Sequence, residues 1–154
     1  LTFVHVTHSQ EEAFALADLA VVMRDGYIEQ QGNPRDIFER PVSAFVADFI
    51  GGHNVIDPSR LDALDLSTKF SIRSDQISID IDDDTYLDNR LVISAKVIDV
   101  EFQAQFFYVE TELTDGQRVM CFLPSDSVDP IILKAGVTVR LSWQRGHINE
   151  FKTH

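Results

Sequence analysis

The apolar and polar positions in the first part of the chain change from strand-like to helix-like spacing. Residues 1–6 form a β-branched and aromatic run, which predicts a strand lying within a sheet. The run ends at Thr7-His8, and Ser9 followed three residues later by Glu12 forms a capping box, so a helix is expected to begin at about Gln10. The apolar stripe of this helix is expected to consist of Ala13, Phe14, Leu16 and Ala17.

A strand hairpin is expected after this helix. Residues 19–23 are continuously apolar, which is typical of a strand covered on both faces in an α/β layer. Asp25-Gly26 permits the positive φ angles of a tight turn, so residues 27–31 are expected to return antiparallel to that strand.

Two short helices are expected next. Gly32-Asn33-Pro34 supplies a cap and a first-turn proline ahead of residues 35–40, and Pro41 ends that helix. Ser43 caps a second helix over residues 44–50. Its apolar side chains recur at helical spacing, so they are expected to face a core or a neighbouring domain; they are Phe45, Val46, Phe49 and Ile50.

Beyond these helices the chain reads as β-rich segments separated by turn residues, as in a small barrel or sandwich. A domain boundary is therefore expected at Gly51-Gly52, with one domain over residues 1–52 and a β-barrel over residues 53–154. Thr114-Asp115-Gly116 is the clearest hairpin turn, while residues 59–66 fit either one or two helical turns or a crossing outside the β-domain. The candidate strands are residues 69–73, 76–81, 91–100, 104–113, 118–123, 137–143 and 147–151.

The charge of the chain excludes one class of partner. The formal charge is −12 and the isoelectric point is near 4.6, whereas binding to a phosphate backbone requires clustered Lys and Arg. Much of the acidity is local, in Asp80-Ile81-Asp82-Asp83-Asp84, which is expected to be a solvated turn rather than a cation site. No nucleic-acid partner is expected.

The cysteine count and the apolar runs indicate a cytoplasmic protein. Cys121 is the single cysteine, so it cannot form an intramolecular disulfide, and it is expected to act as a small apolar side chain in a strand. No apolar run approaches the roughly 18 residues that cross a bilayer, and the first residues do not resemble a signal peptide. Because the chain starts without methionine in a strand-like run, we expect it to be a piece of a larger protein.

A series of short motifs in the first third of the chain carries a family resemblance. It resembles, in order and spacing, the end of the ATP-binding subunits of polyamine, ferric-iron, sulfate and maltose-type ABC importers. The motifs are Val6-Thr7-His8-Ser9-Gln10-Glu11-Glu12-Ala13, Ala17-Asp18, Val22-Met23-Arg24-Asp25-Gly26, Ile28-Glu29-Gln30, Gly32-Asn33-Pro34, Ile37-Phe38, Pro41 and Phe45-Val46-Ala47-Asp48-Phe49-Ile50-Gly51.

The remainder resembles the accessory β-domain called TOBE. Ile72-Arg73-Ser74-Asp75 stands where that family usually has a short Arg-Pro-Glu segment, and Leu141-Ser142-Trp143 precedes the last strand. The resemblance implies an α+β chain, in which an α/β remnant of an ABC ATPase domain is followed by an all-β, OB-like TOBE barrel.

The resemblance also assigns a catalytic role to His8. It implies that His8 is the switch histidine, which contacts the γ-phosphate and the attacking water in the intact parent. Phosphoryl transfer depends mainly on positioning and charge stabilisation, and an imidazole can donate to a phosphate oxygen. From spacing alone, His8 could instead simply end a strand. A metal pair with His5 is opposed by strand alternation, and Gln10, Glu11 and Glu12 fit capping roles, so no metal site is expected.

Other parts of an ATPase site are not found in this sequence. It has no Gly-x-x-x-x-Gly-Lys-Ser/Thr loop, no strand that ends in the acidic pair that would hold magnesium and orient water, and no ABC signature. ATP and Mg²⁺ are therefore expected as cofactors of the intact parent, while this fragment alone should not hydrolyse ATP. The resemblance implies a homodimer with a second copy of the subunit, contact with transmembrane permease subunits at the inner face of the cell membrane, and no direct membrane insertion.

The transported substrate is open at this stage. Residues 45–52 with His53-Asn54-Val55-Ile56 look closest to polyamine subunits, and ferric-iron, sulfate or sugar importers are the alternatives. A different class of function is a small-ligand sensor or regulatory docking module in the TOBE-like domain. An oligonucleotide-binding barrel is opposed by the negative charge.

Overall fold

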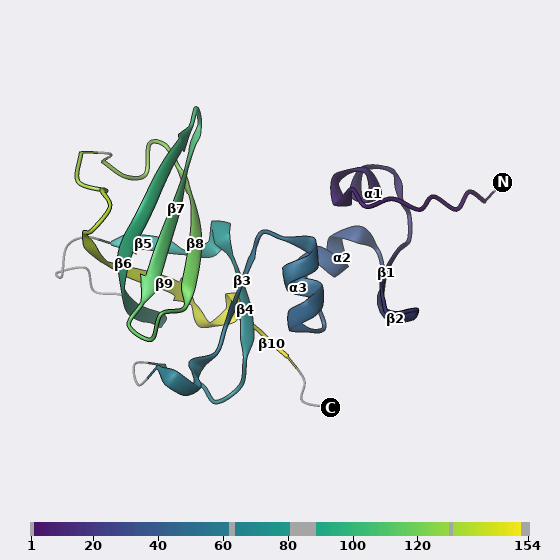
Figure 1. Ribbon diagram of the computed structural model, residues 1–154, viewed down its shortest axis with the longest axis horizontal. Coiled ribbons are helices and arrows are strands. Elements are labelled where there is room, and N and C mark those ends of the chain that lie inside the picture. Colours follow the sequence, from purple (N-terminus) through teal and green to yellow (C-terminus); the bar gives the residue numbers. More distant parts are fainter. Residues whose placement is uncertain (1, 62–63, 81–88, 130, 152–154) are drawn as a thin grey trace.

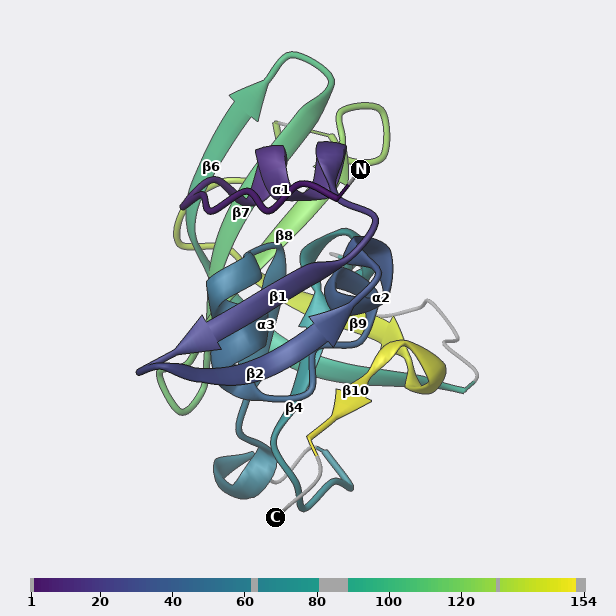
Figure 2. The same cartoon turned by 90° about the vertical axis from the view of Figure 1, so that its right-hand side faces the viewer.

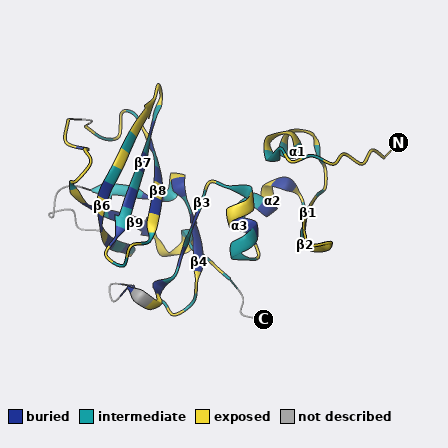
Figure 3. Cartoon of the chain, viewed as in Figure 1, coloured by how far each residue is buried: buried dark blue, intermediate teal, exposed yellow. Residues whose placement is uncertain are grey.

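The computed structural model describes residues 2–61, 64–80, 89–129 and 131–151. Figure 1 shows a small part, built from the residues before Gly52, beside a larger β-rich part built from the rest of the chain. The N-terminus lies at the outer end of the small part (Figure 1). Buried residues are concentrated in the β-rich part, as Figure 3 shows, so the principal core of the molecule is there.

The small part contains three short helices and one hairpin. The helices are α1 (Gln10–Leu16), α2 (Pro34–Glu39) and α3 (Ala44–Ile50), and the strands β1 (Ala20–Arg24) and β2 (Tyr27–Gly32) pair antiparallel. The hairpin lies across α2 and α3 on the side away from the β-rich part (Figure 2). A core of only three buried apolar residues joins the hairpin to these two helices: Val22, Ile37 and Val46.

Local sequence signals begin each helix and close the hairpin. The side chains of Ser9, Asn33 and Ser43 each accept a backbone N–H from the first turn of the helix that follows, at 3.3, 2.9 and 3.3 Å. Asp25 and Gly26 both have positive φ, at 51° and 84°, as the tight turn requires. The three expected caps and the expected turn are thus confirmed, but the capping box at Ser9 is only half formed, because the Ser9 N–H donates to Thr7 Oγ1 rather than to Glu12.

The β-rich part consists of two antiparallel sheets. One has the order β10-β4-β3 and the other β5-β9-β6-β7-β8. Single 3₁₀ turns lie at Pro58–Arg60, Ser74–Gln76 and Arg145–His147. The strands are β3 (His53–Ile56), β4 (Phe70–Arg73), β5 (Ser78–Asp80), β6 (Arg90–Gln103), β7 (Phe106–Leu113), β8 (Arg118–Pro124), β9 (Thr138–Gln144) and β10 (Asn149–Glu150).

Strand alternation builds the core between these sheets. Along β7, every second side chain from Phe107 to Leu113 is buried, and β8 buries Val119, Cys121 and Leu123 in the same way. Trp143 and Phe70 are the largest fully buried side chains. Burial raises the pKa of the Cys121 thiol to about 12, in keeping with its expected role as an apolar side chain.

The expected strand over residues 1–6 is wrong for the residues that the structure describes. Residues 2–6 form no strand, and the side chains of Phe3, Val4 and Val6 are 83%, 90% and 91% exposed. A strand needs a partner for its backbone N–H and C=O groups, and none of the described strands pairs with this segment.

The expected strand over residues 19–23 is confirmed with a shift of one residue, but its cover on both faces is wrong. Val22 is buried, whereas Val21 and Met23 are 45% and 55% exposed, because helices of the described chain cover only one face of the hairpin (Figure 2). Leu16, expected in the apolar stripe of α1, is likewise exposed.

Most candidate strands of the β-rich part are confirmed, and the differences have local causes. Strand β3 is four residues long and starts with two polar residues, so the pattern did not single it out. The candidates at 76–81 and 147–151 are shortened by 3₁₀ turns, and the one at 104–113 by the turn at Ala104 and Gln105.

Two expectations fall partly on positions that the structure does not describe. Of residues 59–66, one 3₁₀ turn ends at residue 60, and Leu61 and Leu64 enter the core instead of crossing outside it. Residues 62–63 lie outside the described residues. In the acidic segment, Asp80 belongs to β5, and residues 81–84 lie outside the described residues.

Candidate functional site

The loop that carries His8 is ordered by hydrogen bonds of its neighbours. Thr7 Oγ1 accepts the Ser9 N–H at 3.0 Å and donates to Glu12 Oε2 at 2.9 Å, while Ser9 Oγ accepts the Glu12 N–H. The capping residues therefore fix the chain on both sides of His8. The His8 side chain itself is exposed, which leaves its ring accessible to a ligand.

The alternative metal pair finds no support in the geometry of this loop. His5 Nε2 lies 3.7 Å from Glu12 Oε2, on exposed side chains. In the part of the chain that the structure describes, no three His, Cys, Asp or Glu side chains gather as a metal site would require.

Helix α1, which follows His8, contacts the rest of the small part through Phe14 and Gln10, among other residues. The Phe14 ring meets the Phe38 ring of α2 edge to face, with centroids 6.2 Å apart. Gln10 Nε2 donates to the carbonyl oxygen of Phe49 in α3 at 2.8 Å. The position of α1 therefore depends on α2 and α3.

His53, at the start of β3, joins α2 to the β-rich part. Its Nε2 lies 2.7 Å from the carbonyl oxygen of Phe38, so this nitrogen carries the proton and donates. Burial lowers the pKa of His53, which favours the neutral ring. The other ring nitrogen, Nδ1, is buried and has no hydrogen-bond partner among the described residues.

Arg73, at the end of β4, contacts the same aromatic residue. Its guanidinium lies over the Phe38 ring, 5.2 Å from the centroid. Arg73 Nε and Nη2 donate to the two carboxylate oxygens of Asp75 at 2.9 and 2.5 Å, and these bonds hold the pKa of Asp75 below its usual value. Asp75 thereby fixes the orientation of the cation on the ring.

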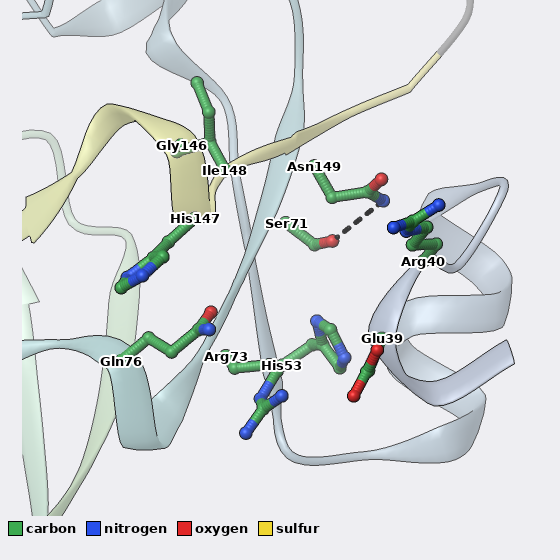
Figure 4. Close-up of a pocket in the computed structure, with 10 residues that line it drawn as sticks. All are labelled: Glu39, Arg40, His53, Ser71, Arg73, Gln76, Gly146, His147, Ile148 and Asn149. Atoms are coloured by element: carbon green, nitrogen blue, oxygen red, sulfur yellow. Dashed lines mark hydrogen bonds between the residues drawn. The ribbon is translucent and has the colours of Figure 1, made fainter. Parts of the chain in front are cut away.

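A hollow of about 360 Å³ lies at this junction, with walls from both parts of the molecule (Figure 4). Asn149 Nδ2 bridges the two, donating to the carbonyl oxygen of Pro41 at 2.6 Å and to Ser71 Oγ at 3.4 Å. His147 has a buried Nδ1 that, like that of His53, is without a described partner. The lining residues are Glu39, Arg40, His53, Ser71, Arg73, Gln76, Gly146, His147, Ile148 and Asn149.

The structure does not bring His8 to this hollow, since His8 is not among its lining residues. His8 stands out in the sequence by its motif, whereas no sequence pattern indicates the contacts of Phe38, His53 and Asn149. Arg73 and Asp75 stood out only as a family-like segment. The spacing of two residues between Arg73 and Asp75 was the one sequence signal of their ion pair. The contact of Arg73 with Phe38 joins positions 35 residues apart, so no local sequence pattern indicates it.

None of the helices in the described chain has the length and apolar character needed to cross a bilayer.

Comparison with protein families matches the TOBE domain over residues 70–149. The spermidine/putrescine import ATP-binding protein PotA of Nitratidesulfovibrio vulgaris is 33% identical over 171 residues, covering 95% of this chain and 46% of that protein. The protein of the same name from Acetivibrio thermocellus is 56% identical over 57 residues, covering 37% of this chain and 16% of that protein. The chain thus spans at most about half the length of these relatives.

Among solved structures, the molybdate-bound form of the cytoplasmic molybdate-binding protein ModG is similar, with a TM-score of 0.50. The similarity covers 58% of this chain and 66% of that chain at 15% sequence identity. At this identity the likeness shows the fold alone, and it supports the OB-like character of the β-rich part.

Proposed function

This chain belongs to the TOBE-domain family, and we propose that it forms part of the ATP-binding subunit of an ABC importer. Polyamines are the substrate class that we propose for this importer. The observation that carries the proposal is the similarity along 95% of the chain to a spermidine/putrescine import ATP-binding protein. In this proposal the subunit acts as a homodimer and contacts permease subunits at the cytoplasmic face of the membrane.

We further propose that residues 1–52 are the end of the ATPase domain and residues 53–154 the TOBE domain. The two apolar cores support this division, because one draws its buried residues from Val22, Ile37 and Val46 and the other only from positions 56 and beyond. The junction at His53, Arg73 and Asn149 is then the contact between the domains.

The chemical role proposed for this chain is confined to His8. An exposed imidazole on an ordered loop can donate to a γ-phosphate oxygen and orient a water molecule for attack. ATP with Mg²⁺ supplies the reactive phosphate and its charge neutralisation. Because this sequence holds no phosphate loop and no strand ending in the acidic pair that would hold magnesium, it offers only the γ-phosphate side of a site, and the chain alone is expected not to hydrolyse ATP.

A chimera tests this proposal. The chain replaces the matching segment of the N. vulgaris spermidine/putrescine import ATP-binding protein, and the product is reconstituted with the permease of that importer. We expect ATP turnover and spermidine uptake in the chimera. His8→Ala should lower kcat at least about 100-fold with nucleotide binding retained, because the lost interaction acts in the transition state.

His5→Ala is the matched control, since it removes an exposed histidine three positions away. It should leave turnover unchanged. Full turnover in the His8→Ala chimera would contradict the role of His8. The same exchange can be made in the ATP-binding subunits of ferric-iron, sulfate and maltose importers. If the chain supports import in one of these chimeras but not in the spermidine chimera, the polyamine assignment is contradicted.

A second candidate function is docking of a small oxyanion in the junction hollow. Two cationic residues, Arg40 and Arg73, line it together with His147, whose buried Nδ1 has no partner among the described residues. Calorimetric titration of the chain with molybdate, sulfate and phosphate is the test. A saturable heat that Arg73→Gln abolishes supports this function, and the absence of saturable heat with all three anions contradicts it.

A further inference from the structure

One aromatic residue is shared by α1 and the β-rich part. Helix α1 meets α2 through the contact of Phe14 with Phe38, and a second side-chain contact, from Gln10, goes to α3. Phe38 lies in α2, whose cap at Asn33 and packing through Ile37 belong to the small part. Phe38 thus carries a ring contact between α1 and α2.

The same residue is held by the β-rich part from several directions. The His53 ring packs edge to face on the Phe38 ring at 5.4 Å, and His53 Nε2 donates to the Phe38 carbonyl oxygen. The Arg73 guanidinium lies over the ring, and Asp75 fixes it there. Gly52 comes so close that an added Cβ would lie 3.3 Å from the Phe38 ring, so the domain connection also fits closely against it.

These contacts form a short continuous path through packed rings. It runs from Asp75 and Arg73 to Phe38, then to Phe14 on α1, and α1 begins two residues after His8. The caps at Thr7 and Ser9 make the loop and the helix a single ordered unit. A displacement of β4 against α2 therefore changes the packing surface on which α1, and with it His8, is held.

We propose that Phe38 is a positioning residue, which couples the placement of the His8 loop to the β-rich part. Phe38 contacts Phe14 on one side and Arg73 and His53 on the other. The proposal rests on the proposed function of His8. The β-domain thereby influences phosphoryl transfer without touching the nucleotide, since the orientation of a catalytic group decides how well it meets the reacting atoms.

The first test uses the chain itself and needs no ATPase activity. Amide hydrogen exchange is measured in α1 for Phe38→Leu and for Arg73→Gln, which removes the cation on the other side of the junction. Both variants should lower protection in α1 by about tenfold, because they free its packing surface. Phe106→Leu is the matched control, since its ring stacks on Phe122 on the outer face of β7 and touches neither α1 nor α2 in the described contacts.

Unchanged protection of α1 in Arg73→Gln overturns the coupling. This variant keeps the Phe14 and Phe38 rings, so it remains informative if Phe38→Leu unfolds the small part.

The second test uses the chimera with the N. vulgaris subunit. Phe38→Leu should lower kcat about tenfold with KM for ATP unchanged, as expected for a group acting through the position of another. Phe106→Leu should leave both values unchanged. If His8→Ala retains turnover, the proposed function fails; if His8→Ala abolishes turnover while Phe38→Leu behaves like Phe106→Leu, only the inference on Phe38 fails.

Discussion

Asn54 is a buried side chain that satisfies the backbone of a strand far away in the sequence. Its Oδ1 accepts the Met120 N–H at 2.7 Å and its Nδ2 donates to the Met120 carbonyl oxygen at 2.8 Å. The amide thus acts as one rung of a ladder between β3 and the edge of β8, and joins the two sheets. Nothing in the pattern around Asn54 indicated this role, because both partners belong to a residue 66 positions away.

Replacing Asn54 by alanine should therefore be costly. Asn54→Ala leaves two backbone groups of Met120 without partners, and we expect the free energy of unfolding to fall by about 2–3 kcal/mol. Urea denaturation measures the change. Thr114→Ala, in the exposed turn between β7 and β8, serves as the control and should change stability by less than about 0.5 kcal/mol. Equal effects of the two substitutions would contradict the bridging role.

His53 makes stability depend on pH in a definite direction. Burial lowers the pKa of His53 in the folded chain and outweighs the hydrogen bond to the Phe38 carbonyl oxygen, which raises it; Arg73 lowers the pKa further, and Asp75 raises it. Between the ordinary value of 6.5 and the lower folded value, the unfolded chain binds more protons than the folded chain. The contribution of His53 to stability is therefore present above pH 6.5 and is lost as the pH falls through the folded pKa.

We expect the free energy of unfolding to decrease as the pH is lowered from 6.5 toward 5, and this slope to weaken in His53→Gln. Carboxylates with a lowered pKa, such as Asp75 and Glu39, change the free energy of unfolding only at pH values below this range, because their ordinary pKa values are 3.8 and 4.5. Chemical denaturation at half-unit pH steps provides the measurement, with His5→Gln as the control at an exposed position. A slope that persists unchanged in His53→Gln would assign the effect to other groups.

At the scale of elements, the helices followed from the sequence more closely than the strand environment did. A cap and a first-turn proline act within three or four residues, so Ser9, Asn33 and Ser43 identified their helices directly. The burial of side chains on the two faces of β1 depends on the elements that pack against each face. In the described chain, helices lie against one face only (Figure 2). Local chemistry therefore predicted where elements begin, whereas sheet neighbours and junction contacts required the fold.

The cap of α2 offers a direct test at this scale. Asn33→Ala removes the acceptor for the Arg35 N–H, and we expect a loss of about 1 kcal/mol in the stability of the small part. Amide exchange in α2 compared with β7 measures this loss, since β7 belongs to the other core. Asn33→Asp, which keeps an acceptor oxygen, should retain most of the protection. Loss of protection in both variants would point to a cause other than the cap.

At the scale of the whole molecule, the two cores differ greatly in size. Among the described residues, three buried apolar residues form the core of the small part, whereas twenty form the core of the β-rich part. Since buried apolar area is the main favourable contribution to folding, the β-rich part should be the more stable unit.

Residues 53–154 should therefore fold without the small part. We expect this segment to unfold cooperatively in urea, with Trp143 reporting the transition from a fully buried environment. Trp143 is the single tryptophan of the chain, so its emission reports the β-rich part alone. A gradual transition, or red-shifted emission before urea is added, would show that the segment depends on residues 1–52.

The bond from Asn149 to the Pro41 carbonyl joins two segments that the ribosome makes at different times. The two residues are 108 positions apart, and at ribosomal speeds of about 5–20 residues per second Pro41 is made roughly 5 to 20 s before its partner. Over that interval Phe38 of α2 can already contact His53 and Arg73, while β10, which carries Asn149, is still unmade. The contact of Pro41 with β10 is thus made after the contacts of Phe38 with His53 and Arg73, so nascent chains truncated before Asn149 should leave the segment around Pro41 more open to proteases.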